Sequence, residues 1–306
     1  MLDKNILDQV RGVFASLKSQ ITFAATSKKD DEKKGELQEF LNDIASTSEK
    51  LSVSFTEEEN AQLSFKLLKD NNETGITFRG IPNGHEFTSL LLAVLNTDGQ
   101  GKNFPDEAIQ RRIKSLKGEI ALKTYVSLTC TNCPDVVQAL NLMSLINPNI
   151  KHEMVDGGIY QQEVSDLNIQ GVPAVYCNNE SLHIGRGDLG ILLQELEDMV
   201  GSEALENEES IEREYDVIVV GGGPAGASAA IYSARKGLKV GLVAERIGGQ
   251  VNDTTGIQNL ISVPNTNGTQ LAADLKAHLS DYPIELFEHR KIASVSLKEK
   301  IKSIKV

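Results

Sequence analysis

A glycine-rich turn between an apolar strand and a helix of small residues constrains the fold of this chain most tightly. Residues 215–220, YDVIVV, have the nearly continuous apolar pattern of a buried parallel strand. The turn GGGPAG follows at 221–226 and leads into the helix-like run ASAAIYSARKG. A second strand-like run, from Leu238 to Ala244, ends at Glu245. This order predicts a Rossmann-like, dinucleotide-binding segment.

Each part of this fingerprint has its own physical role. Gly221 allows the tight turn, Gly223 lets the backbone approach a pyrophosphate, and Gly226 allows the helix to pack closely against the strand. Glu245, 19 positions after Gly226, is placed to bind the hydroxyls of an adenosine ribose. The strand, turn, helix, second strand and acidic residue together predict binding of an adenine dinucleotide.

A Cys-x-x-Cys pair lies at another junction of a strand and a helix. Cys130 and Cys133 follow the strand-like run Ile120 to Leu128 and precede a helix-like run that begins near Pro134. Two intervening residues let the sulfurs meet across one turn, so the pair indicates a dithiol/disulfide couple. The unpaired N–H groups and positive dipole end of the helix favour a thiolate on Cys130, the sulfur expected to face solvent.

Half of a structural zinc site is the alternative interpretation of this pair. Such a site normally needs four Cys or His ligands, and here Cys177 and five scattered histidines remain, without a second short-spaced pair. We interpret Cys177, 44 positions after Cys133, as a small buried hydrophobic residue. Three cysteines, two of them in one Cys-x-x-Cys, indicate redox or catalytic use of cysteine.

Pro173 stands in the run GVPAV, just before a β-branched segment. A proline is poorly suited to the centre of a sheet because it cannot donate a ladder hydrogen bond. One solution is a cis Val172–Pro173 peptide bond that turns the end of the strand toward the dithiol.

The chain divides into four segments by pattern. Strand-like and helix-like runs in 1–117 are followed by a similar order in 118–200, at an offset of roughly a hundred residues. We therefore predict an α/β protein with two similar units side by side, of which only the second carries cysteines. Segment 201–214 contains six glutamates and one arginine, which predicts a solvated linker, with partner docking as the alternative. The dinucleotide segment occupies 215–306.

Composition narrows the classes of partner. The formal net charge of -12 argues against binding of nucleic acid or of an anionic membrane surface. No apolar stretch approaches the roughly 20 residues needed to span a bilayer. The start MLDKNILDQVRGVF lacks the apolar core of a signal peptide. We expect a soluble cytoplasmic protein without a nucleic-acid or membrane partner.

Taken together, these features resemble the F subunit of bacterial alkyl hydroperoxide reductase, a family of flavoprotein disulfide reductases that serve a peroxiredoxin. The resemblance extends over essentially the whole chain. It rests on the runs TCTNCPDVVQALN, GVPAV, AERIGGQ and DTTGIQNLISVPNTNGTQLAADLKAHL. It implies tandem thioredoxin-like folds, the first without cysteines and the second with the dithiol, followed by a partial Rossmann-like FAD-binding domain.

The resemblance also implies cofactors and site residues. FAD is the implied cofactor, and NAD(P)H is the electron donor of the complete family enzyme. Glu86, in the run GHEF, matches a family glutamate that exchanges protons beside the dithiol, whereas the sequence alone indicates a helix-start carboxylate. The resemblance favours the cis bond before Pro173. The residues that it assigns to FAD, the last two of them near the flavin ring, are Gly221, Gly223, Pro224, Ala225, Gly226, Glu245, Arg246, Gly249, Gln250 and Asn259.

The implied mechanism is thiol–disulfide exchange that supports peroxide detoxification. Cys130, as a thiolate, attacks a disulfide of the peroxiredoxin, and Cys133 resolves the mixed disulfide. Glu86 supplies or removes a proton as the charge on sulfur changes. Members of this family typically form homodimers through the flavin module.

The sequence departs from the family pattern toward its C-terminal end. The family's nicotinamide domain, its second Cys-x-x-Cys and the returning strand and helix of the flavin pocket have no counterpart before Val306. We therefore expect an incomplete copy whose FAD pocket lacks part of its wall. Two alternatives remain open: a stand-alone exchange module reduced by another reductase, or a non-enzymatic module that docks a peroxiredoxin.

Overall fold

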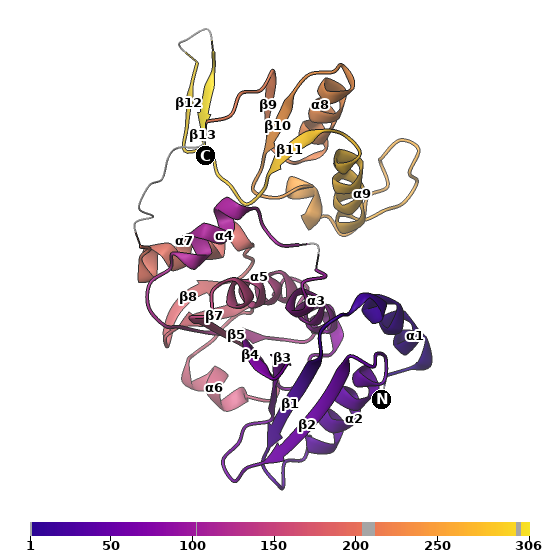
Figure 1. Cartoon of the computed structure of the whole chain (residues 1–306), viewed down its shortest axis with the longest axis vertical. Coiled ribbons are helices and arrows are strands. Elements are labelled where there is room, and N and C mark those ends of the chain that lie inside the picture. The colour runs from indigo at the N-terminus through magenta and orange to yellow at the C-terminus, as the bar shows by residue number, and fades with distance from the viewer. Residues whose placement is uncertain (1, 102, 204–211, 298–300) are drawn as a thin grey trace. The chain divides into compact units, whose positions relative to one another are not determined.

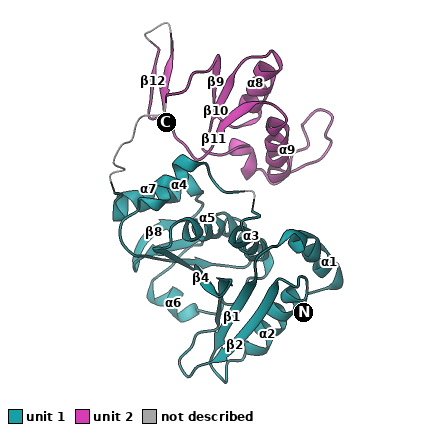
Figure 2. Ribbon diagram, in the orientation of Figure 1, with its two compact units in different colours: residues 1–204 teal, residues 205–306 magenta. Residues whose placement is uncertain are grey.

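The computed structural model of the chain describes residues 2–101, 103–203, 212–297 and 301–306 (Figure 1). These residues belong to two compact units, Met1–Ala204 and Leu205–Val306 (Figure 2). Most of the predicted acidic linker, 201–214, lies outside the described residues. None of the described helices combines the length and the apolar character needed to cross a lipid bilayer.

The first unit is built on one eight-stranded sheet of order β2-β1-β3-β4-β6-β5-β7-β8. Its strands are β1 Ile21–Ser27, β2 Leu51–Glu57, β3 Ser64–Lys69, β4 Asn72–Arg79, β5 Ile120–Val126, β6 Ile150–Asp156, β7 Ala174–Cys177 and β8 Glu180–Ile184. Its helices are α1 Lys4–Val13, α2 Lys34–Ala45, α3 Phe87–Asp98, α4 Glu107–Lys114, α5 Cys133–Ile146, α6 Gln161–Asp166 and α7 Leu189–Val200, with 3-10 turns η1 Phe14–Ser16 and η2 Gly84–Glu86.

The sheet is a duplicated arrangement, as the sequence predicts. In the first half β1 pairs in parallel with β2 and antiparallel with β3, and in the second half β5 does the same with β6 and β7. Strands β5 and β6 and helix α5 begin 99 positions after β1, β2 and α2. The parallel pairing of β4 with β6 joins the halves. The two expected units therefore share one sheet.

The core of the first unit has two parts, and α5 contributes to both. In the first half, Phe65 packs edge-on against Phe23 and stacks on Phe78 at 5.2 Å between ring centroids. Among the buried residues of α5, Val137 joins this first core. Val136, Leu140 and Met143 join the second core, and α5 also contacts α3 of the first half (Figure 1). The helix that begins at the dithiol thus lies where the two halves meet.

The second unit contains a three-stranded parallel sheet of order β11-β10-β9. Its elements are β9 Val217–Val220, α8 Pro224–Arg235, β10 Val240–Val243, η3 Gly249–Asp253, α9 Gly268–Ser280 and β11 Ile284–Phe287, with the hairpin β12 Ser294–Ser296 and β13 Ser303–Lys305. The expectation that 215–220 forms a fully buried strand is wrong in one respect. Among the described residues β9 pairs only with β10, so its residues are half-buried and Val220 is 55% exposed.

Candidate functional site

The dithiol lies at the carboxyl end of β5, where the chain turns into α5. Cys130 and Cys133 form a disulfide with Cα atoms 5.5 Å apart. Helix α5 begins at Cys133 itself, and Pro134 occupies its first turn, where the missing N–H has no helical partner to lose. The expected strand–turn–helix setting of the pair is confirmed.

The two cysteines differ in accessibility. Cys133 is fully buried, whereas Cys130 is half-buried between the exposed residues Thr129 and Thr131. A partner disulfide can reach only a sulfur that meets solvent. The difference agrees with the choice of Cys130 as the attacking sulfur and Cys133 as the resolving one.

The Val172–Pro173 peptide bond is cis, as expected. The carbonyl oxygen of Val172 lies 3.7 Å from the sulfur of Cys130. Pro173 is buried, and its own carbonyl accepts a hydrogen bond from the Gly185 N–H at 2.8 Å. The turn predicted to approach the dithiol therefore does so through backbone atoms.

Glu86 reaches this region from the first half of the sheet. It ends η2, a turn that contacts α5 and whose His85 N–H donates to the Leu128 carbonyl, 3.0 Å away, just before the dithiol. A side chain on Gly84 would collide with that same carbonyl oxygen, so glycine lets η2 lie directly on the loop. Glu86 is thus the helix-start residue expected from sequence, yet it is fully buried.

Burial sets the protonation of Glu86. Loss of solvent raises the pKa of its carboxyl group to about 7 from the ordinary value of 4.5, and the nearby Asp135 charge adds to the rise. The Ser89 hydroxyl offsets part of this rise, although its geometry falls short of a hydrogen bond to either carboxyl oxygen. A carboxyl group of this kind gains or loses a proton near neutral pH.

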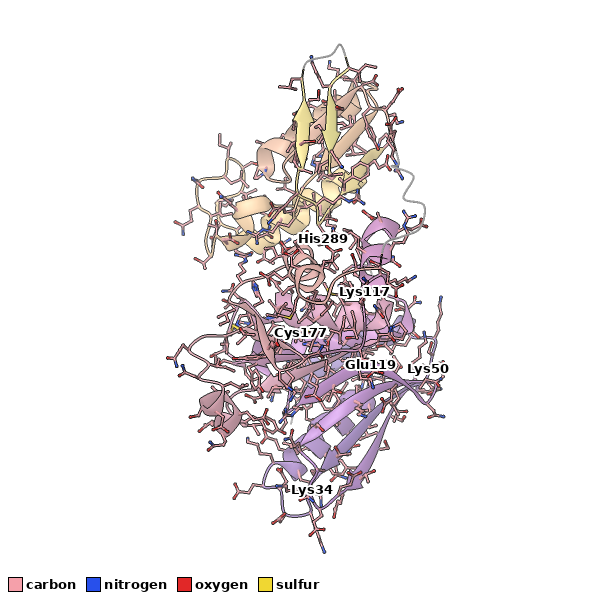
Figure 3. All side chains as sticks on the ribbon, turned by 90° about the vertical axis from the view of Figure 1, so that its left-hand side faces the viewer. Lys34, Lys50, Lys117, Glu119, Cys177 and His289 are labelled. Atoms are coloured by element: carbon pink, nitrogen blue, oxygen red, sulfur yellow. A yellow bond between two sulfur atoms is a disulfide. The ribbon has the colours of Figure 1, made fainter. Side chains whose placement is uncertain are left out.

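Cys177 is buried in β7 (Figure 3), as the sequence predicts. Burial raises the pKa of its thiol, which makes this sulfur a poor nucleophile. Among the described residues, no group of three or more His, Cys, Asp or Glu side chains is arranged to hold a metal ion.

The glycine turn of the second unit has the geometry that a dinucleotide needs. Gly221 follows β9 with φ of 108°, a conformation that favours glycine. A side chain on Gly226 would collide with the Gly221 carbonyl oxygen, so Gly226 permits the close approach of α8. At Gly223 a Cβ would meet no atom nearer than 3.8 Å, which leaves this backbone accessible at the start of α8.

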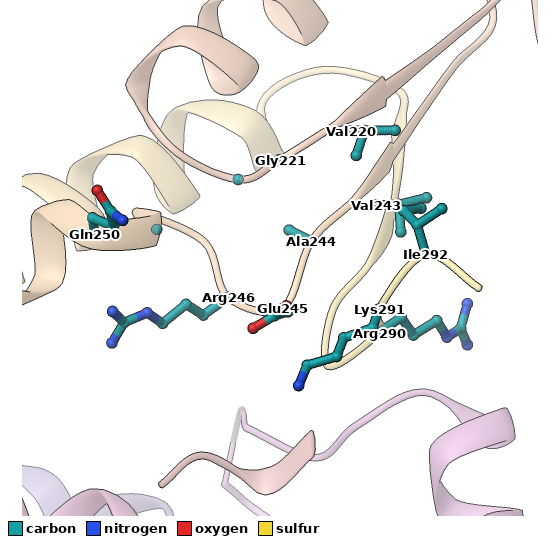
Figure 4. Close-up of a pocket in the computed structure, with 12 residues that line it drawn as sticks. Val220, Gly221, Val243, Ala244, Glu245, Arg246, Gln250, Arg290, Lys291 and Ile292 are labelled. Atoms are coloured by element: carbon teal, nitrogen blue, oxygen red, sulfur yellow. The ribbon is translucent and has the colours of Figure 1, made fainter. Parts of the chain in front are cut away.

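A cavity of about 310 Å³ opens at the carboxyl ends of β9 and β10 (Figure 4). The predicted site residues that line it are Gly221, Glu245, Arg246, Gly249 and Gln250. Pro224, Ala225 and Gly226 form the first turn of α8. Asn259 is exposed in the loop between η3 and α9 and does not line the cavity, so its role near a flavin ring stays a prediction.

Sequence reasoning missed the segment after β11 that contributes to this cavity. Arg290, Lys291 and Ile292 follow β11 and line the opening beside Glu245 (Figure 4). The available signal was a basic doublet just after the third strand. Arg246, in turn, forms an ion pair with Asp253 at 2.9 Å. The cavity therefore combines backbone N–H groups, one carboxylate and several cations, a set suited to a ribose and a pyrophosphate.

Comparisons with known proteins agree with this arrangement. Residues 216–299 match a family model described as FAD dependent oxidoreductase. Over 98% of its length the chain is 44% identical to a Bacillus subtilis protein named NADH dehydrogenase, of which it covers 57%. Over 93% of its length it is 45% identical to the alkyl hydroperoxide reductase F subunit of Staphylococcus aureus, of which it covers 54%. The chain thus spans about half the length of these curated relatives.

A solved structure matches the first unit. The N-terminal domain of the alkyl hydroperoxide reductase F subunit of Enterococcus faecalis superposes with a TM-score of 0.60 and 32% identity. The match covers 64% of this chain and 100% of that domain. The tandem thioredoxin-like folds expected from sequence are therefore confirmed, and the chain belongs to the family of alkyl hydroperoxide reductase F subunits.

Proposed function

We propose that this chain is a disulfide oxidoreductase that passes electrons from NAD(P)H, through FAD and the Cys130–Cys133 dithiol, to a disulfide of a peroxiredoxin. The observation that carries the proposal is the disulfide itself: a half-buried sulfur joined to a buried one at a helix start. The partner class is the one that the family resemblance implies, and the relatives are named as F subunits of alkyl hydroperoxide reductase. Removal of peroxides would then be the role of the partner.

The proposed exchange conserves electrons and protons. The Cys130 thiolate attacks one sulfur of the partner disulfide, that S–S bond breaks, and the leaving thiolate takes up a proton from solvent, which offsets the proton that Cys130 released when it ionised. Cys133 loses its proton, attacks Cys130 in the mixed disulfide, and releases the second partner thiolate, which is also protonated. The partner gains two electrons and two protons, while Cys130–Cys133 becomes a disulfide.

Glu86 is proposed to accept the proton that Cys133 loses and to return a proton in the reverse direction. Its raised pKa, about 7, supports this role, since an efficient acid–base group titrates near the working pH. Contact between η2 and α5, which begins at Cys133, supports its location on the buried side of the dithiol.

The second unit is proposed to hold FAD. The fit rests on Gly221, Gly223 and Gly226 at the turn and on Glu245 in the cavity, which suit the pyrophosphate and the adenosine ribose. When bound, FAD supplies the two-electron transfer between a nicotinamide and the dithiol. We further propose a cytoplasmic enzyme, because a dithiol that must return to its reduced form suits a reducing compartment. The family resemblance adds the proposal that the complete enzyme is a homodimer.

Reduction of a protein disulfide tests the proposal. With dithiothreitol as the electron source, the chain is expected to speed reduction of oxidised peroxiredoxin, and Cys130→Ser is expected to abolish the acceleration. Cys177→Ser is the matched control, because this buried sulfur lies outside the exchange. Peroxiredoxin binding without acceleration would contradict the proposal and favour the docking alternative.

Flavin binding separates the two remaining functions. Titration of the chain with FAD is expected to quench flavin fluorescence, and Gly226→Ala is expected to prevent quenching, because the added methyl group would collide with the Gly221 carbonyl. Disulfide exchange by a chain that leaves FAD fluorescence unchanged would contradict flavin-linked transfer and favour a stand-alone exchange module.

A further inference from the structure

His183 lies on β8, the strand that pairs with β7 just after the cis turn at Pro173. Its side chain, on β8, is only 10% exposed. The Nδ1 atom lies 2.9 Å and 3.1 Å from the two carboxylate oxygens of Glu195 on α7. The Nε2 atom lies 3.1 Å from the carbonyl oxygen of Gly185 and 3.0 Å from that of Arg186. Both ring nitrogens therefore face hydrogen-bond acceptors.

These four oxygens fix the position of the His183 ring from both of its nitrogens. At least one ring nitrogen carries a hydrogen and donates it to an oxygen that it faces. Glu195 on α7 therefore ties the ring, and the turn beside it, to this helix. Asp188, the other carboxylate near this turn, instead caps α7 by accepting from the Ile191 N–H at 3.0 Å.

The turn after β8 is shaped around the ring. Gly185 has φ of 92°, in the region that favours glycine. A Cβ on Gly187 would lie 2.8 Å from Nε2 of His183, so a side chain at Gly187 would displace the imidazole. The two glycines thus let the carbonyl groups of Gly185 and Arg186 approach the His183 ring.

A short series of contacts connects this turn to the dithiol. The Gly185 carbonyl oxygen lies 3.1 Å from Nε2 of His183, and the Gly185 N–H donates to the Pro173 carbonyl at 2.8 Å. The preceding carbonyl, that of Val172, lies 3.7 Å from the Cys130 sulfur. In the reduced dithiol, this carbonyl is placed to accept the proton of the Cys130 thiol. Its position therefore affects how readily Cys130 ionises.

We propose that His183, paired with Glu195, is a positioning residue that holds the Val172 and Pro173 carbonyls in place and so sets the balance between thiol and thiolate at Cys130. This inference rests on the proposed function, in which Cys130 is the attacking sulfur. Without His183, the turn at Gly185 no longer holds the Val172 carbonyl oxygen close to the Cys130 thiol. The thiol then loses this hydrogen-bond acceptor, and water reaches the Cys130 sulfur. Both changes favour the thiolate, so loss of His183 is expected to make Cys130 ionise at lower pH.

Alkylation of Cys130 tests the proposal. In a Cys133→Ser background of the full chain, the rate of iodoacetamide reaction is measured across pH, and the modified cysteine is identified by mass spectrometry. His183→Gln is expected to lower the midpoint by about half a pH unit, a roughly three-fold rise in thiolate below the midpoint. Glu195→Gln keeps the shape of the side chain that contacts His183, and it is expected to lower the pH midpoint by a smaller amount.

Two controls separate positioning from general destabilisation. Leu182→Ala shortens the side chain next to His183 in the sequence, which packs against the core of the second half. This change is expected to lower the melting temperature without moving the pH midpoint of alkylation. His278→Gln changes an exposed histidine of the second unit and should change neither the melting temperature nor the pH midpoint of alkylation. An unmoved midpoint in folded His183→Gln would overturn the proposal. An equal shift in Leu182→Ala would do the same, and if His183→Gln does not fold, an unmoved midpoint in Glu195→Gln decides against it.

This readout is independent of exchange with a partner. A chain that fails to reduce peroxiredoxin but shows the shifted midpoint contradicts the proposed function and supports the role of His183. A chain that reduces peroxiredoxin but shows no shift supports the function and contradicts the role of His183.

Discussion

The two halves of the first unit share one strand–loop–helix framework, but only the loop of the second half carries the dithiol. Strands β1 and β5 are each seven residues long, and six-residue loops, 28–33 and 127–132, connect them to α2 and α5. The first loop reads KKDDEK and the second SLTCTN. At the common offset of 99 positions, Cys130 corresponds to Asp31 and Cys133 to Lys34.

This difference shows that the framework sets the location of a reactive loop but not its reactivity. Lys34 pairs with Glu57, and Asp31 accepts a hydrogen bond from the Lys33 N–H at 2.9 Å. The positions that correspond to the two cysteines are therefore engaged in polar contacts, Asp31 within its own loop and Lys34 with β2. The first half instead contributes to the dithiol through η2, which brings buried Glu86 to α5.

A partly buried ion pair also links the two halves. Arg79 on β4, whose side chain is 5% exposed, binds both carboxylate oxygens of Glu163 on α6 and lies over the Tyr160 ring at 4.2 Å from its centroid. The Tyr125 hydroxyl donates to the same carboxylate at 3.0 Å. Hydrogen bonding and charge from Arg79 hold the pKa of Glu163 below its ordinary value. The pair thus adds a side-chain contact between the halves to the β4–β6 strand pairing.

The largest expected effect concerns the reactive loop. Cys130→Ser is expected to reduce the rate of disulfide reduction by at least about a thousand-fold, because a serine hydroxyl does not form the mixed disulfide. Far-UV circular dichroism should stay unchanged, since Cys130 is only half-buried. Residual exchange within ten-fold of the parent rate would assign the attack to another sulfur.

The next effect concerns the contact between the halves. Arg79→Ala is expected to lower the free energy of unfolding by about 3 kcal/mol, because it leaves the Glu163 carboxylate without its buried partner. The matched control is Lys66→Ala, which removes an ion pair with Glu73 that is more than half exposed, and should change stability by no more than about 0.5 kcal/mol. If urea denaturation shows that Arg79→Ala and Lys66→Ala lower the free energy of unfolding equally, the expected role of Arg79 between the halves is wrong.

Glu86 should make stability depend on pH. Its folded pKa, about 7, lies above the ordinary 4.5, so the unfolded chain releases this proton more readily. Stability from this group is therefore intact below pH 4.5 and is lost as pH rises to about 7, by up to about 3 kcal/mol. Glu86→Gln should remove this part of the slope in urea denaturation at several pH values. A slope identical to that of the parent chain would contradict the assignment.

The smallest effect is expected at the counterpart of Cys130. Asp31→Asn should change stability by less than about 0.5 kcal/mol, because asparagine also accepts the hydrogen bond from the Lys33 N–H. The rate of disulfide reduction should stay within two-fold of the parent rate. A large loss of exchange would mean that the first loop takes part in the chemistry.

Local motifs explain what could be predicted from the sequence. The Cys-x-x-Cys pair and the roles of Gly221 and Gly226 follow from backbone requirements within a few residues. For the Val172–Pro173 bond, the local pattern left cis as one solution, and the family resemblance favoured it. The duplication followed from the recurrence of strand and helix patterns. These features depend on short-range geometry, which the sequence expresses directly.

Contacts between distant segments could not be predicted in this way. The β4–β6 pairing and the contact between Arg79 and Glu163, which are 84 positions apart, arise from the arrangement of whole elements. The same holds for Arg290 at the cavity and for His183 on β8, neither of which belongs to a short motif. Burial of Glu86 also depends on packing, because a helix-start carboxylate is usually exposed.

Trapping the mixed disulfide tests the central claim most directly. Reduced Cys133→Ser chain is mixed with oxidised peroxiredoxin, and the covalent complex is digested and sequenced by mass spectrometry. The account predicts a stable complex joined through Cys130, and none from the Cys130→Ser chain. A complex joined through Cys177, or one that forms as readily without Cys130, would contradict the account.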